Sequence, residues 1–307
     1  MNPYPKKILS LQDQIKSLED AGMKISDMGK LETALTTVGY YRLRGYMFPF
    51  YDNANKKYQP NTSFDTILSL YSFDQELSLL LTDILTKIEV ALRARIVEAL
   101  LLSQNALVYL DATYFDDKLK YWQNLSSISN EVSRSSDAFI LHNLNNHDGQ
   151  MPIWAVVEVM SFGTLSKLIK SLGYSSHHST IPIYQTFASH YQYPSDKHGV
   201  LLIPNTDMLS SWIHTAVILR NMCAHNARIY NRPFTVKPQI IKKDLRTPPP
   251  KFKGLYEALL ALKYLRPTDD DWITFSHQLS ALLSKYSSTI DLKRLNFPTD
   301  WQSHFSL

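Results

Sequence analysis

The segment from Phe64 to about Leu102 carries the longest regular apolar pattern in this 307-residue chain. Apolar side chains recur there at steps of three and four residues: Phe73, Leu77, Leu80, Leu81, Ile84, Ile88, Ala91, Leu92 and Ile96. This spacing places them on one face of an α-helix. The pattern therefore predicts one long helix against which the rest of the chain packs.

The scarcity of glycine favours an all-α fold. The chain has 9 glycines in 307 residues, about 3% where about 7% is usual. All-β folds with tight turns and α/β folds with Gly-rich phosphate loops normally contain more glycine. A hydrophobic content of 44% and a charged content of 20% are those of an ordinary globular protein.

The patterns divide the chain into four segments. Residues 1–63 are expected to form an N-terminal helical segment that contains the string YYRLRGY at residues 40–46. Residues 64–232 are expected to form the helical core, with a polar, exposed insertion near 126–148. A basic, Pro-rich linker at 233–253 then precedes a C-terminal helical segment at 254–307.

The net charge and the cysteine content limit which partners and which cellular compartment the chain can have. The formal net charge is +4, which is compatible with a nucleic-acid partner without requiring one. The single cysteine, Cys223, excludes an intrachain disulfide and fits a reducing compartment. No apolar run is long enough for a signal peptide or a membrane span. We therefore expect a cytoplasmic protein without a membrane partner.

Several common catalytic motifs are absent from the sequence. It contains no G-x-x-x-x-G-K-[ST], no H-E-x-x-H and no G-x-S-x-G motif, so P-loop, zincin and hydrolase-elbow chemistry lack support. Four histidines crowd one stretch without acidic or cysteine partners at ligand spacing: His177, His178, His190 and His198. We expect no metal site and no cofactor there.

Arg220 interrupts an otherwise apolar helix pattern. It continues the stripe set by Leu209, Ile213 and Ala216 in a helix expected to begin at Asn205 or Thr206. A guanidinium at such a position is costly unless it is paired or faces an anion. Two interpretations stay open, namely an ion pair with a carboxylate such as Glu89 or Glu158, and a site for a bound anion.

The spacing of Arg220 and His225 adds a geometric condition. Five residues on a straight helix turn the two side chains by about 140° from one another. They serve one site only if the helix ends between them or if two copies of the chain share the site. Asn226 and Pro233 favour an end near His225.

An arginine and a histidine beside an amide suit the cleavage of RNA by its own 2′-hydroxyl. Histidine acts as a general base or acid near neutral pH. Arginine holds the phosphate and stabilises the additional negative charge of the transition state. Because the 2′-hydroxyl is the nucleophile, this reaction requires no metal-bound water.

The sequence RNMCAHN at residues 220–226 resembles the R-x4-H motif of HEPN ribonucleases. Three further blocks resemble the Abi-like family of bacterial abortive-infection proteins, the AbiD/AbiF group: residues 41–46 with Pro49 and Phe50, residues 71–74 running into 88–93, and residues 152–154 through 160–165. The four blocks follow in the family's order and together span about residues 40–232.

The resemblance implies a HEPN-like helical bundle, here with N-terminal and C-terminal helical extensions, in which the motifs of a homodimer meet at the interface. It implies a metal-independent endoribonuclease in a toxin-antitoxin-like phage-defence system. The products would carry 2′,3′-cyclic phosphate and 5′-hydroxyl ends. His225 would be the acid/base group, Arg220 the phosphate clamp and Asn221 the positioning residue. A structured non-coding RNA or another antitoxin is an implied partner.

Further residues are candidates for RNA contact: Arg228, Tyr230, Arg232, Arg42, Arg44, Lys242 and Lys243. Each also has an ordinary structural interpretation, because the tyrosines of residues 40–46 can pack the N-terminal helices and the basic linker can be a solvated segment. Trp154 and Phe162 are expected in the core. The alternative function is a non-catalytic RNA-binding or RNA-sensing protein, and a purely structural helical scaffold is a third.

Overall fold

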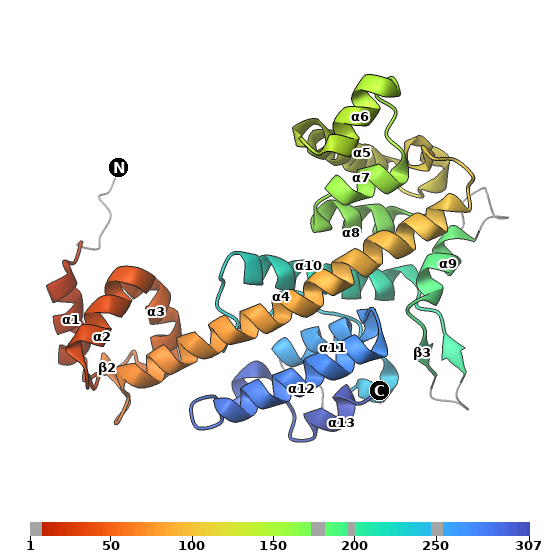
Figure 1. Cartoon of the computed structure of the whole chain (residues 1–307). Helices are drawn as coiled ribbons and strands as arrows, with labels where there is room; N and C mark the ends of the chain where they lie inside the picture. The colour runs from red at the N-terminus through yellow and green to blue at the C-terminus, as the bar shows by residue number, and fades with distance from the viewer. Residues whose placement is uncertain (1–7, 173–181, 196–199, 247–253) are drawn as a thin grey trace.

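The computed structural model describes residues 8–172, 182–195, 200–246 and 254–307. Within these ranges it is mostly helical, and the strands form two short antiparallel hairpins (Figure 1). One hairpin pairs β1 (Tyr51–Asp52) with β2 (Lys57–Tyr58), and the other pairs β3 (Tyr193–Pro194) with β4 (Leu201–Leu202). The predicted all-α class is confirmed.

The long helix α4 (Phe64–Leu101) runs through the molecule and forms its axis (Figure 1). The Ser63 hydroxyl accepts a hydrogen bond from the Thr66 backbone N–H and so caps its first turn. Leu77, Leu81 and Leu92 of its apolar stripe are completely buried. The helix predicted from Phe64 to about Leu102 is therefore present.

The N-terminal unit packs at the first end of α4 (Figure 1). It contains α1 (Leu11–Asp20), α2 (Met28–Ala34) and α3 (Tyr40–Met47), and the YYRLRGY string forms most of α3. A π-helical turn (Leu35–Gly39) joins α2 to α3 and ends at Gly39 with a φ of 90°. Glycine reaches this conformation without the strain that a side chain causes.

The other end of α4 is covered by short helices (Figure 1): α5 (Lys118–Arg134), α6 (Ala138–Asn146), α7 (Ile153–Val159), α8 (Phe162–Ser171) and α9 (Ile183–Ser189). The segment near 126–148, expected as an exposed insertion, forms the end of α5 and all of α6, and it buries Ile128 and Ile140. Phe162 is buried as expected. The expectation for Trp154 is wrong, because its neighbours on α7 occupy the buried positions and leave the indole 49% exposed.

Helix α10 (Thr206–Ala224) lies against α4, α8 and α11 (Leu255–Leu265). Helix α12 (Asp269–Lys285) also packs on α4, and α13 (Trp301–Phe305) follows near the C-terminus (Figure 1). Every residue of α11 is buried. The C-terminal segment therefore shares the core of the central segment.

The chain between α10 and α11 is packed rather than solvated in the part that the structure describes. Phe234, Val236 and Ile241 are buried, and the Trp212 indole N–H donates a hydrogen bond to the Gln239 carbonyl at 2.6 Å. A 3-10 turn (Lys242–Asp244) follows. The interpretation of residues 233–246 as a solvated linker is wrong, because apolar residues interleave with its lysines and prolines. Residues 247–253 lie outside the described ranges.

Candidate functional site

The end of α10 fixes the position of His225. The Asn226 N–H donates to the Cys223 carbonyl, the Ala227 N–H donates to the Met222 carbonyl at 2.8 Å, and Asn226 adopts a positive φ of 49°. This is a Schellman ending, in which asparagine takes the left-handed position. The predicted helix end near His225 is confirmed. It leaves the imidazole exposed at the helix terminus.

Arg220 points from α10 toward α4. Its Nε lies 3.6 Å from Oε2 of Glu89, and its side chain is 40% exposed. Oε1 of the same carboxylate is 2.5 Å from Nη2 of Arg93. The ion pair with Glu89 was one of the two interpretations left open by the sequence, and it is present. The other expected partner, Glu158, is an exposed residue of α7.

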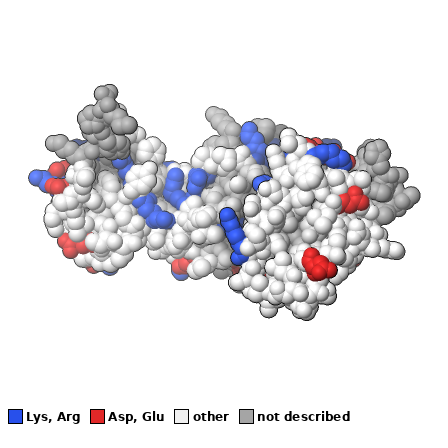
Figure 2. Space-filling view, turned by 90° about the horizontal axis from the view of Figure 1, so that it is seen from above, with Lys and Arg blue, Asp and Glu red and all other residues white. Residues whose placement is uncertain are grey.

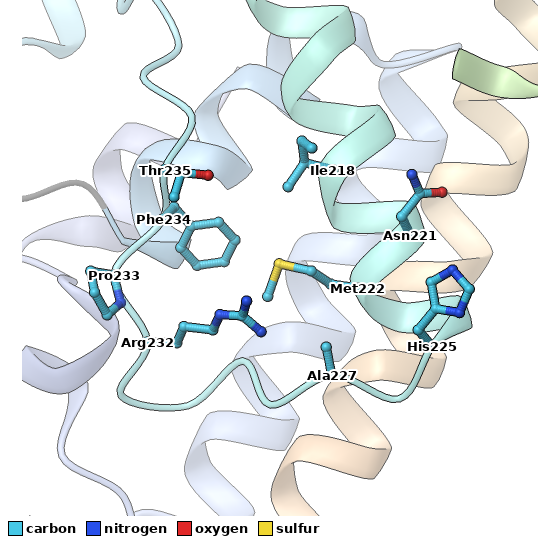
Figure 3. A pocket seen from close by; sticks show the side chains of 9 residues that line it. All are labelled: Ile218, Asn221, Met222, His225, Ala227, Arg232, Pro233, Phe234 and Thr235. Carbon is cyan, nitrogen blue, oxygen red and sulfur yellow. The ribbon is translucent and has the colours of Figure 1, made fainter. Parts of the chain in front are cut away.

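Asn221 connects Arg220 to the surface around His225. Its Oδ1 accepts a hydrogen bond from Nη1 of Arg220 at 3.3 Å. Asn221 and His225 are four residues apart and line the same open hollow of about 310 Å³ (Figure 3). Arg220 is not among the residues that line this hollow. One chain thus presents the Asn221 amide and the His225 imidazole side by side, and the Arg220 guanidinium is hydrogen-bonded to that amide.

The far wall of the hollow is the segment that returns from α10. Arg232, Pro233 and Phe234 form this wall, and the Arg232 guanidinium points toward Met222 (Figure 3). Arg232 is exposed. Arg232 and His225 therefore line the same hollow.

The other candidates for RNA contact have different environments. Arg42 of α3 donates a hydrogen bond from Nη1 to the Asn226 carbonyl at 2.5 Å and is otherwise exposed. Arg228 is half-buried and donates from Nη1 to the carbonyls of Tyr230 and Asn231 at 2.8 and 3.0 Å. Arg44 lines a separate hollow in the N-terminal unit. Lys242 and Lys243 are exposed on the 3-10 turn.

The expectation that Tyr230 contacts RNA is wrong. Its side chain is 1% exposed, its ring packs edge-on against Phe73, and its hydroxyl accepts a hydrogen bond from the Asp291 N–H at 3.0 Å. Tyr230 is therefore part of the core, because the segment after α10 turns inward there.

Asp74 holds this segment against α4, although it was not among the site residues expected from the sequence. Its carboxylate, on α4, accepts hydrogen bonds from the Ile229 N–H at 2.8 Å and the Tyr230 N–H at 2.9 Å. It also accepts one from the Tyr46 hydroxyl of α3 at 2.9 Å. Asp74 is 2% exposed. The available signal was an acid between Phe73 and Leu77 in the buried stripe of α4.

Asp74 thus joins three of the blocks noted in the sequence: the YYRLRGY string, the start of α4 and the segment that follows His225. Arg42 and Arg228 add contacts at the same junction. A Cβ on Gly45 would lie 3.1 Å from Nε of Arg228, so a larger residue would crowd that side chain. The junction positions His225 relative to α3.

The titration of Asp74 predicts a pH dependence of stability. Burial raises the pKa of Asp74 to about 6, against the opposing effects of its hydrogen bonds and Arg228. Between about pH 4, where the unfolded chain loses this proton, and about pH 6, the folded state binds more protons. The contribution of Asp74 to the free energy of unfolding therefore decreases as the pH rises through this window, by up to about 3 kcal/mol.

Urea unfolding at pH 4.5 and pH 7, with Asp74→Asn as the non-titrating reference, measures this difference. The unfolding free energy of the parent minus that of Asp74→Asn is expected to be larger at pH 4.5 than at pH 7. A difference that is the same at both pH values, or smaller at pH 4.5, would contradict the prediction.

Glu89 is expected to stabilise the two arginines that flank it. Arg93 also donates to the carbonyls of Val157 and Met160 and so attaches α7 to α4. The side chains of Glu89 and Arg93 are only 14% and 12% exposed. Glu89→Gln leaves the buried guanidinium without its counter-charge, and we expect a loss of about 1–3 kcal/mol in unfolding free energy.

Chemical denaturation of Glu89→Gln and of Glu158→Gln, the exposed carboxylate of α7, provides the comparison. The second variant is expected to change stability by less than about 0.5 kcal/mol. Equal effects of the two substitutions would show that the Glu89 ion pairs contribute nothing to stability.

In the view of Figure 2 the molecule narrows between its two ends, and positive charge gathers around this narrowing, here called the waist. Figure 2 shows Lys and Arg side chains around the narrowing between the two ends, while most of the Asp and Glu side chains visible there lie toward the ends. Such a distribution attracts polyanions and positions their phosphates.

Among the described residues, no group of three or more His, Cys, Asp or Glu is arranged to hold a metal ion. His177, His178 and His198 lie outside those residues, and His190 lies 3.2 Å from the Glu98 carboxylate. No helix in the described part of the chain combines the length and apolar character needed to cross a membrane.

Comparisons with known proteins give one match. The model of a family described as Abi-like protein matches residues 33–231, which is more than half of the chain. The match begins within α2 and ends in the segment that Asp74 holds, so it contains α3, α4 and α10. No curated protein and no solved structure matches the chain.

Proposed function

The chain belongs to the Abi-like family, and on that premise we propose that it is a metal-independent endoribonuclease that acts in abortive infection. Family membership indicates that the chain is an abortive-infection protein. Abortive infection is a form of defence against phage. Beyond the family's role, we propose that the substrate is RNA, that the reaction is cleavage through the 2′-hydroxyl, and that residues at the end of α10 carry it out.

The observation that carries the proposal is the arrangement at the end of α10. Asn221 accepts a hydrogen bond from Arg220 and lines the same hollow as the exposed His225. An imidazole, an amide and a guanidinium are groups that can transfer a proton and stabilise a phosphate.

In the proposed reaction, the 2′-hydroxyl of RNA loses its proton to an imidazole and attacks the adjacent phosphorus. The bond from phosphorus to the 5′-oxygen breaks, and that oxygen takes a proton from an imidazolium. The products are a 2′,3′-cyclic phosphate and a 5′-hydroxyl. His225 supplies the imidazole, while Arg220 and Arg232 stabilise the charge on the phosphoryl oxygens.

A second copy of the chain is part of this proposal. Because Arg220 faces α4 while His225 faces the hollow, one protomer brings only part of the catalytic set to one surface. Pairing of two copies through the ends of their α10 helices would place Arg220 of each copy beside His225 of the other, which gives two equivalent sites. A symmetric dimer provides such a self-complementary arrangement.

The alternative function, RNA binding without cleavage, is favoured by a separate observation. Glu89 already neutralises part of the charge of Arg220, and an arginine held by a carboxylate is less available to a phosphate. In this case the basic waist would bind RNA, and the end of α10 would have a structural role.

Incubation of the purified protein with a mixed RNA pool in EDTA separates the two functions. The proposal predicts fragments that accumulate with time without added metal. RNA that is bound at low salt, released at high salt and recovered intact would overturn the nuclease and support the binding protein.

A further inference from the structure

Helix α3 separates two differently lined surfaces of the N-terminal unit. On one side Arg42, Gly45 and Tyr46 contact the segment that follows His225 or the Asp74 carboxylate that holds it. On the other side Tyr40 and Arg44, four residues apart, line a hollow of about 240 Å³. Helix α3 thus presents one side to the segment after His225 and to Asp74, and the other side to this hollow.

Four of the nine residues that line this hollow are aromatic: Tyr40, Phe48, Tyr51 and Tyr58. Tyr51 and Tyr58 come from the β1–β2 hairpin, and Phe48 from the turn that follows α3. The Tyr51 and Tyr58 rings meet edge-on, with centroids 5.1 Å apart, and the Tyr58 hydroxyl donates to the Met47 sulfur at 3.5 Å. The hairpin therefore holds these rings in fixed positions.

Among the described residues that line this hollow, Arg44 is the single charged one. It is exposed, and no hydrogen bond or ion pair joins its guanidinium to another described residue. Burial and the neighbouring hydroxyls of Tyr40 and Tyr51 raise the pKa of Tyr58, while Arg44 acts in the opposite direction. The cation therefore lies close to the tyrosine cluster and remains available to a ligand.

We propose that this hollow binds an unpaired nucleobase of RNA, which stacks on its tyrosines while Arg44 holds a phosphate beside that base. Rings with an adjacent arginine are the usual means of binding single-stranded nucleic acid without sequence preference. The volume suits one planar group. The inference rests on the proposed function, because it takes RNA to be the ligand.

The hollow lies on the far side of α3 from the segment after His225, within reach of an RNA strand that passes around this helix. Arg42 and Arg44 stand on the same short helix, and Arg42 contacts the residue after His225. A strand whose phosphate lies at His225 can therefore pass α3 and place a base a few nucleotides away in the hollow. Cleavage would then depend on an unpaired base near the scissile bond.

Fluorescence of a single-stranded RNA that contains 2-aminopurine tests the proposal, because stacking on an aromatic ring quenches this base. All proteins carry His225→Ala so that the RNA stays intact. The parent is expected to quench the fluorescence on binding. Tyr51→Leu is expected to reduce the quenching and weaken binding about tenfold, and Tyr51→Phe to restore both. Arg44→Gln is expected to weaken binding several-fold.

Two matched controls use the same residue types outside the hollow. Tyr41, on the same helix, is 90% exposed, and Arg134 is an exposed arginine of α5. Tyr41→Leu and Arg134→Gln are expected to keep the parent's affinity within about twofold. Parent-like quenching and affinity in both Tyr51→Leu and Arg44→Gln would overturn the inference.

Further measurements distinguish the ligand source and separate this inference from the nuclease. A free mononucleotide that competes as effectively as the RNA, and loses affinity in Tyr51→Leu, would overturn the assignment to RNA. RNA that binds through the hollow but is never cut by the protein with His225 intact would overturn the proposed function alone. Cleavage together with unchanged binding by the hollow variants would overturn this inference alone.

Discussion

Replacing His225 by alanine is expected to lower the rate of RNA cleavage by at least about 100-fold, the usual contribution of a positioned general acid or base. The imidazole is exposed at the end of α10 and is not part of the hydrophobic core, so the substitution should leave the fold intact. His214→Ala is the matched control, because His214 is also an exposed histidine of α10. That variant is expected to keep the parent rate within about twofold.

Mixing two inactive variants tests whether two protomers share the site. If one site takes Arg220 from one copy and His225 from the other, a heterodimer of Arg220→Ala and His225→Ala retains one intact site. Equal mixing with free exchange should then restore about a quarter of the parent activity. Failure to restore activity in confirmed heterodimers would contradict a shared site.

Replacing Asp74 by alanine is expected to cause the largest loss of stability among the residues discussed. The substitution removes an acceptor from the buried backbone N–H groups of Ile229 and Tyr230 and from the Tyr46 hydroxyl. Each of these three buried donors left unsatisfied costs about 1–3 kcal/mol. The variant also no longer buries a carboxylate, which offsets part of this cost, so we expect a decrease of about 3–5 kcal/mol in unfolding free energy. Urea denaturation monitored by circular dichroism measures it.

Asp83→Ala is the control on the same helix. Asp83 is exposed and forms a surface ion pair with Lys87 at 3.1 Å, which is worth less than about 1 kcal/mol. Because Asp74 holds the segment after His225, Asp74→Ala should also lower activity at temperatures where it stays folded. Equal stability of the two variants would contradict the role assigned to Asp74.

Local patterns predicted the main helices and the end of α10. The apolar period over residues 64–102 corresponds to α4, and Asn205 caps α10 through its side chain, as expected. Asn226 ends α10 because asparagine tolerates the left-handed conformation. These features depend on residues close together in the sequence.

Contacts between distant segments were less accessible to sequence analysis. Tyr230 lies among polar and basic residues and was expected at the surface, yet Asp74, 156 positions away, draws its backbone into the core. The packing of Phe234 and Val236 was hidden by the surrounding lysines and prolines. For Arg220, the sequence left open an ion pair with a carboxylate such as Glu89 or Glu158 and a site for a bound anion. The approach of α10 to α4 places Glu89 beside it.

The end groups of RNA fragments produced in EDTA test the central claim most directly. The parent protein is expected to leave 2′,3′-cyclic phosphate and 5′-hydroxyl ends, and His225→Ala to leave the same RNA intact. Fragments with 3′-hydroxyl and 5′-phosphate ends, or cyclic-phosphate ends produced equally by the parent and His225→Ala, would contradict attack by the 2′-hydroxyl with His225 as the proton-transfer group.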